Sequence, residues 1–198
     1  AVVSKGAAPA NAVEIAQISS RPISDWISYM LQVSDNALAE SLARLVSLDQ
    51  GFDGSPATFT NAFRSALATA QLDLSGVKIE DGSGLSRYNQ VSPKLFNDLL
   101  TLVAKNQANL GEIRKGLPVA GSPGSLSGRF GELVGLVEAK TGWIRTGYTL
   151  SGYLKAEDES TLIFTAYNLG DSVSEANRDA LDRLVAGFQA CGLALANR

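Results

Sequence analysis

A change in hydrophobic period near residue 136 constrains the fold more than any other feature of this sequence. Upstream, apolar residues recur at the three- and four-residue spacing of helices that face a core on one side. Downstream, three β-rich segments follow one another, at residues 136–144, 147–156 and 161–168. The short polar connections between them suit hairpins. The sequence therefore predicts an α/β chain with a helical first half, then an antiparallel three-stranded meander.

The first part of the chain contains one expected strand and two expected helices. Alternation over residues 13–18 suggests a short half-buried strand. Pro22 then opens a helix whose apolar stripe fits core packing and consists of Ile23, Trp26, Ile27, Met30 and Leu31. Ser34-Asp35-Asn36 precedes a second helical run, and these residue types favour caps over helix interiors. We expect the triplet at a helix entrance, where capping alone would explain Ser34 and Asn36.

Two serine-proline pairs organise the middle of the chain. Ser55-Pro56 and Ser92-Pro93 each place a capping residue before a proline at the first helical position, so a helix is expected after each. Between them, Asp81-Gly82-Ser83-Gly84 signals a tight turn. After the strands, an amphipathic helix around residues 181–188, capped by Ser174, is expected to cover one face of the sheet.

Composition narrows the functional classes. The 198 residues are 45% hydrophobic and 19% charged, with a net charge of -3, so one domain is the default and nucleic acid is not an expected partner. No apolar stretch approaches the roughly 18 residues of a membrane span. The single cysteine, Cys191, is expected to pack as a small apolar residue. Because the chain has no histidine, imidazole-dependent triads and bases are excluded, which leaves lysine-assisted or carboxylate chemistry, or none.

Lys140-Thr141-Gly142 falls within the first expected strand. Alternate side chains of a strand share a face, so Lys140 and Gly142 point one way and Thr141 the other unless a twist or bulge re-aims them. A glycine there lets another backbone or a ligand approach closely. A lysine on an edge strand is otherwise a solvated charge that discourages strand pairing. The combination is the first indication of a binding site.

Four ordered stretches carry a resemblance to a known family. They are SDNALAE (34–40), DGSGLSRYNQVSP (81–93), LPVAGSPGSLSGRF (117–130) and AKTG (139–142). Together they resemble the C-terminal half of the penicillin-binding-protein-4 type of D-alanyl-D-alanine carboxypeptidase/endopeptidase, one of the penicillin-recognising serine enzymes. The resemblance implies that residues 1–198 form part of a single transpeptidase-like catalytic domain. It also implies acyl transfer through a covalent serine ester, with no metal or organic cofactor.

The same resemblance implies roles for individual residues. Ser34 would carry proton transfer, and Asn36 would hold the amide of the substrate. Lys140 would supply a positive field to the pocket. Thr141 would bind the terminal carboxylate of a stem peptide that ends in D-Ala-D-Ala, a charge-assisted contact.

Gly142 and Trp143 extend this substrate-binding stretch. The resemblance makes the backbone N–H of residue 143 one of two oxyanion donors. The family usually has threonine at this position, so a hydroxyl contact to the substrate carboxylate is lost in this chain. A backbone donor survives the change of side chain.

The family's nucleophile belongs to a Ser-x-x-Lys motif that precedes the Ser-Asp-Asn triplet. The 33 residues before Ser34 do not contain it. The single formal match, Ser75 to Lys78, lies between a helix and a strand, so we interpret Ser75 as part of a turn and Lys78 as solvent-facing. We therefore expect the chain to lack the nucleophile helix and the first strands of the sheet, and to be inactive alone. A companion segment is expected to cover the exposed edge at 161–168.

Two classes of function stay open at this stage. The first is an exported serine-type DD-peptidase that acts on peptidoglycan stem peptides in the periplasm or cell wall and binds β-lactams. The second is a non-catalytic peptidoglycan-binding or scaffold domain that keeps the shape of the pocket. A β-lactamase is disfavoured, because the DGSGLSR and LPVAG stretches resemble the peptidase subgroup. A Ser-x-x-Lys segment in the native polypeptide would discriminate between the first two.

Overall fold

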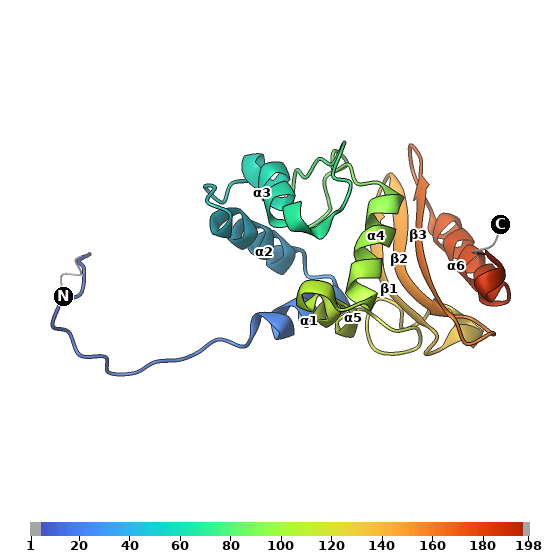
Figure 1. Cartoon of the computed structure of the whole chain (residues 1–198), viewed down its shortest axis with the longest axis horizontal. Coiled ribbons are helices and arrows are strands. Elements are labelled where there is room, and N and C mark those ends of the chain that lie inside the picture. Colours follow the sequence, from blue (N-terminus) through green and yellow to red (C-terminus); the bar gives the residue numbers. More distant parts are fainter. Residues whose placement is uncertain (1–4, 196–198) are drawn as a thin grey trace.

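A computed structural model describes residues 5–195, in which an antiparallel sheet lies between helices and a helical lobe extends to one side (Figure 1). The strands are β1 (Val137–Ile144), β2 (Gly147–Lys155) and β3 (Thr161–Leu169). The α-helices are α1 (Ile23–Val33), α2 (Asn36–Asp49), α3 (Phe59–Ala66), α4 (Pro93–Ala104), α5 (Gly111–Lys115) and α6 (Glu175–Gln189). Short 3-10 turns are η1 (Pro56–Thr58), η2 (Ala68–Ala70), η3 (Gln107–Asn109), η4 (Gly131–Leu133) and η5 (Gly192–Leu195).

The sheet order is β1-β2-β3, as expected for a meander. Its register places Lys140 opposite Ser151, and Ser151 opposite Thr165, so these three side chains form a row across one face. In the described part of the chain no segment pairs with the outer side of β3, so the expected edge strand is confirmed.

Helices cover both faces of the sheet. Behind it, α6 contributes Leu181 and Val185 to the larger core, which also contains Val137, Ala139, Leu150, Leu154 and Phe164. In front, Leu100 and Val103 of α4 pack with Leu117 and Tyr153. The Tyr153 hydroxyl donates a 2.7 Å hydrogen bond to the carbonyl of Leu100, and burial raises the pKa of Tyr153 to about 12, so the donor stays protonated at neutral pH.

The helical lobe is held together by polar contacts as well as packing. In α2 only Ala43 and Ser47 are buried. The 81–84 turn lies against this helix: the N–H of Gly82 donates to Glu40 at 2.7 Å, and a Cβ at position 82 would lie 2.5 Å from the Cβ of Ala43. Glycine is needed at this contact because any side chain would push the turn away from α2.

The capping signals in the sequence are largely confirmed. The Ser92 hydroxyl accepts from the N–H of Leu95 at 3.1 Å, and α4 begins at the expected proline. Ser174 forms a capping box with Asn177 at the start of α6. Ser55 makes no side-chain cap, and the chain enters α3 through the 3-10 turn at Pro56.

Three expectations are wrong. Residues 13–18 are extended but not a strand, and Val13, Ile15 and Ile18 are 85%, 99% and 96% exposed, because no described segment offers them a ladder partner. The stripe of α1 does not reach a core: no residue of this helix is buried, and Trp26 is 38% exposed. Cys191 is exposed rather than packed.

Candidate active site

The Ser-Asp-Asn triplet forms the sharp connection between α1 and α2. Ser34 ends α1 in a left-handed conformation, with φ 58° and ψ 51°. Asp35 is the N-cap of α2, since its carboxylate accepts from the N–H of Leu38 at 2.9 Å. Capping, which residue type alone suggested for Ser34 and Asn36, is therefore performed by the residue between them. The side chains of Ser34 and Asn36 are left exposed and available for other contacts.

A hydrogen bond from Lys140 joins the Lys140-Thr141-Gly142 triplet to the Ser34-Asp35-Asn36 triplet. The Nζ of Lys140 donates to the Ser34 hydroxyl at 2.8 Å, across 106 residues of sequence, and to the carbonyl of Thr141 at 2.7 Å. Burial lowers the pKa of Lys140, because a charged ammonium loses hydration there. An amine of lowered pKa that touches a hydroxyl can exchange a proton with it more readily than an ordinary surface lysine can.

Gly142 continues β1 beyond Lys140 and lies close to a side chain of the neighbouring strand β2. A Cβ at this position would lie 2.3 Å from the Thr149 hydroxyl oxygen, so the group that approaches this glycine is a side chain of β2 rather than another backbone. On the outer side of β1, the carbonyl of Val137 accepts from Ala120 and the N–H of Ala139 donates to Pro118, both at 2.9 Å. Because backbone groups alternate sides along an antiparallel ladder, the N–H of residue 143 points to this outer side too.

Trp143 is the most exposed side chain of this stretch. It is 65% exposed and stacks on Tyr148, with ring centroids 6.1 Å apart and planes 27° apart. An aromatic pair at such spacing forms a firm apolar surface. The surface lies at the rim of a cavity that begins where β1 leaves Lys140.

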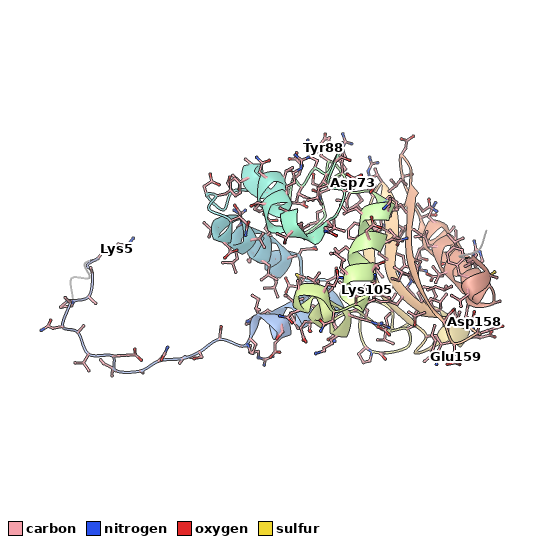
Figure 2. The ribbon with its side chains drawn as sticks, viewed as in Figure 1. Lys5, Asp73, Tyr88, Lys105, Asp158 and Glu159 are labelled. Atoms are coloured by element: carbon pink, nitrogen blue, oxygen red, sulfur yellow. The ribbon has the colours of Figure 1, made fainter. Side chains whose placement is uncertain are left out.

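The cavity has a volume of about 960 Å³ and lies between the end of the sheet and the loop at 75–92. The sheet side includes Gly142, Trp143, Thr149 and Tyr167; the opposite side includes Phe63, Asp81, Arg87, Asn89 and Phe96. Figure 2 shows Asp73 and Tyr88 at the top of the view on the lobe side, away from Asp158 and Glu159 at the lower right. Ser34 and Lys140 do not line the cavity itself, but Gly142, two residues beyond Lys140 on β1, does.

Asp81 shapes the loop that forms the far wall. Its carboxylate accepts from the N–H groups of Gly84 at 2.8 Å and Ser86 at 2.7 Å, and from the side-chain amide of Asn89 at 2.8 Å. These bonds confirm the expected tight turn. The carboxylate is therefore engaged in building the loop.

Ser75 and Lys78 do not form a catalytic pair. The backbone N–H of Ser75 donates to Asp73, and Lys78 lies in an isolated bridge with Gln90 while its ammonium contacts Glu80 at 2.7 Å. The segment is not helical, so the turn interpretation is confirmed, although Ser75 does line the cavity.

Arg114 contacts the strand that carries Lys140, and the sequence analysis did not single it out. Its guanidinium engages both carboxylate oxygens of Glu138, at 2.7 and 2.9 Å, on the strand that carries Lys140. Glu138 and Lys140 are two residues apart on β1, so the alternation of side chains along a strand puts this acid and this base on the same face. The sequence offered no signal for which distant arginine would meet the acid.

Comparisons with known proteins identify the class of molecule to which this arrangement belongs. In the sequence of a D-alanyl-D-alanine carboxypeptidase of Haemophilus influenzae, 34% of residues are identical over 84% of this chain. A carboxypeptidase of Mycobacterium tuberculosis is 30% identical over 97% of it. The model of the D-Ala-D-Ala carboxypeptidase 3 (S13) family matches residues 1–188. The chain belongs to this family.

Solved structures agree with that assignment. Penicillin binding protein 4 of Haemophilus influenzae, solved with a β-lactam, superposes with a TM-score of 0.75 at 31% identity over 85% of this chain. A predatory peptidoglycan endopeptidase of Bdellovibrio bacteriovorus, 19% identical, shares the fold with a TM-score of 0.64 over 85% of the chain. The chain spans 36% and 43% of the two sequence relatives, and 41% and 43% of the two structures.

Proposed function

We propose that this chain contributes part of the active site of an exported serine-type DD-peptidase. The enzyme hydrolyses peptidoglycan stem peptides that end in D-Ala-D-Ala, outside the cytoplasmic membrane. The observation that supports this most directly is the 2.8 Å hydrogen bond from Lys140 to Ser34. It joins two motif residues far apart in sequence, next to a cavity large enough for a peptide terminus.

In the proposed reaction, a serine outside these 198 residues gives its hydroxyl proton to the lysine of its own Ser-x-x-Lys motif and attacks the carbonyl of the penultimate D-Ala. The N–H of residue 143 donates to the oxyanion that forms. Ser34 passes a proton to the amine of the departing D-Ala, and Lys140 resupplies it through the hydrogen bond between them. Water then cleaves the acyl-enzyme ester, which regenerates the serine.

Substrate recognition is proposed to involve the remaining motif residues. The hydroxyl of Thr141 and the charge of Lys140 would meet the terminal carboxylate, and the exposed amide of Asn36 would hold the peptide. Trp143 has no hydroxyl for that carboxylate, so Thr141 carries this contact without help from its neighbour. β-Lactams imitate the same acyl-D-Ala-D-Ala terminus and are proposed to bind at these groups.

The nucleophile is proposed to lie on a companion segment that completes a single catalytic domain with residues 1–198. A β-strand of that segment would pair with the outer side of β3, where no segment within residues 5–195 forms a ladder, and would satisfy the backbone groups there. In this proposal the chain alone binds ligand weakly and does not turn it over.

Intact mass spectrometry with benzylpenicillin tests the position of the nucleophile. The 198-residue chain is expected to gain no penicilloyl adduct, whereas a polypeptide that adds a Ser-x-x-Lys segment is expected to gain one. Ser75→Ala is the matched control, because Ser75 is the only serine here in a Ser-x-x-Lys match. An adduct on the chain alone that Ser75→Ala removes would overturn the proposed division of the site.

Fluorescence tests binding separately from acylation. The chain has two tryptophans, Trp26 and Trp143, so Trp26→Phe leaves a single reporter at the cavity rim. Titration with benzylpenicillin is expected to change this emission, and Thr141→Val is expected to weaken the response. Lys155→Met, at the exposed end of β2, serves as the control. Ligand binding by a completed polypeptide that never forms an adduct would favour the non-catalytic binding domain instead.

A further inference from the structure

Arg114 and Glu138 form a fork-shaped ion pair beside the proposed catalytic lysine. The guanidinium contacts both carboxylate oxygens, through Nε at 2.7 Å and Nη2 at 2.9 Å. It also lies 4.2 Å from the centre of the ring of Tyr153, a residue of β2, which is within the range of a cation–π contact. Both ionic side chains are about one-third exposed, at 36% and 31%. The pair is therefore well oriented and partly shielded from water.

Glu138 is the acid nearest to Lys140 along the strand. The two residues are separated by one position on β1, so their side chains share a face roughly 6.6 Å apart at the backbone. A free carboxylate at this spacing can reach an ammonium on a flexible stem. Such a contact would draw Lys140 away from Ser34 and favour its charged form.

Four other described residues near Lys140 or its partner Ser34 do not compete for the ammonium in this way. Ser151 and Thr165, which complete its row on the sheet, are uncharged. Tyr153 on the same face has a pKa of about 12 and is neutral. Asp35, next to Ser34, is occupied as the N-cap of α2. Among Glu138 and these four residues, only Glu138 is a negatively charged side chain on the same face of the sheet as Lys140.

We propose that Arg114 is a positioning residue, which binds Glu138 and thereby keeps that carboxylate from pairing with Lys140. The inference rests on the role proposed above for Lys140. Arg114 does not touch the substrate. It acts through Glu138, and its effect is to leave the ammonium directed at the Ser34 hydroxyl.

A lysine at position 114 would perform this task less well. Arginine presents two parallel N–H groups that match both oxygens of a carboxylate, whereas a lysine ammonium is a single point charge. One oxygen of Glu138 would then stay available to Lys140. The proposal therefore predicts that both Arg114→Lys and Arg114→Met raise the pKa of Lys140, and that the methionine variant raises it more.

The protonation of Lys140 can be measured on the 198-residue chain without substrate. Trace acetylation at a series of pH values, read by peptide mass spectrometry, gives the titration of each lysine amine. Arg114→Met is expected to raise the pKa of Lys140 by about one pH unit, a tenfold change in its protonation equilibrium. Glu138→Gln is expected to produce no rise, and the double variant Arg114→Met/Glu138→Gln to abolish the rise.

A second ion pair supplies the matched control. Arg129 makes a similar fork to Asp182 of α6, on the other side of the sheet from Lys140. Arg129→Met is expected to destabilise the fold without moving the titration of Lys140. Circular dichroism would confirm that each variant is folded.

A titration of Lys140 that stays fixed in folded Arg114→Met would overturn the proposal, as would a rise that persists in the double variant. These outcomes differ from failure of the proposed function. Loss of β-lactam binding would leave the titration intact, and an unmoved titration would leave β-lactam binding intact.

Discussion

The sheet and α1 differ in how far each completes its own packing. In β2, Leu150 and Leu154 are fully buried, with helices on both faces of the strand. In α1 no residue is buried, and Tyr29 is 50% exposed. The candidate site lies where these two regions meet, since Lys140 comes from the sheet and Ser34 from the end of α1. The strand that carries Lys140 is thus held by a packed core, whereas the position of Ser34 depends on how α1 packs against the rest of the chain.

A close contact at Gly116 is what docks α1. A Cβ at this position would lie 2.7 Å from the Cα of Ser28, so only glycine allows the backbone after α5 to approach the helix. Gly124 makes a similar approach, where a Cβ would lie 3.3 Å from the carbonyl of Gln32. The position of Ser34 therefore depends on a few backbone contacts rather than on a buried apolar face. This difference between the two regions can be tested by substitution.

The largest expected effect comes from truncating the same residue type in a core and on a surface. Leu154→Ala is expected to lower the free energy of unfolding by about 2–5 kcal/mol, because it leaves a cavity among fully packed neighbours. Leu45→Ala, in α2 at 54% exposure, is expected to cost less than about 1 kcal/mol. Urea denaturation measures both. Equal losses would mean that the helical lobe is as tightly packed as the sheet.

An intermediate effect on the free energy of unfolding is expected from two glycine substitutions, one that lowers it and one that raises it. Gly116→Ala should destabilise by about 1–3 kcal/mol, because its Cβ would meet the backbone of α1. Gly187→Ala, in α6 with no neighbour within 4 Å of its Cβ, should stabilise by about 0.5–1 kcal/mol through helix propensity. Thermal unfolding distinguishes the two. If Gly116→Ala proves neutral, α1 is not docked by this contact.

The sequence predicted most elements because their signals are local. The period change and the capping residues at Ser92 and Ser174 depend on neighbours a few positions away, and the strands formed as expected. The failures involve partners that local pattern does not reveal. Residues 13–18 alternate like a strand but find no ladder partner, and the stripe of α1 finds no core within residues 5–195.

The candidate site shows the same division. Motif resemblance selected Ser34 and Lys140, and the structure brings them into hydrogen-bond contact. It did not reveal that Asp35 would cap α2 alone, which leaves the hydroxyl of Ser34 for Lys140. Nor did it indicate Arg114, since the pairing with Glu138 depends on how α5 meets the sheet. Contacts between distant segments are set by tertiary packing, which spacing within one segment does not encode.

The smallest expected effect is a pH dependence that originates where the two regions meet. Burial lowers the pKa of Lys140 in the folded chain below the roughly 10.4 of an unfolded lysine. Between those two values the unfolded state binds more protons, so the free energy of unfolding should rise with pH there and fall as pH drops through the folded value. Lys140→Met should remove this component, and Lys155→Met should keep it, because Lys155 is exposed on the same sheet. Urea titrations of all three proteins, compared as differences so that the shared tyrosines cancel, measure it. A wild-type slope identical to that of Lys140→Met would mean that the amine is as well hydrated as a surface lysine, and that the sheet does not shield it beside Ser34.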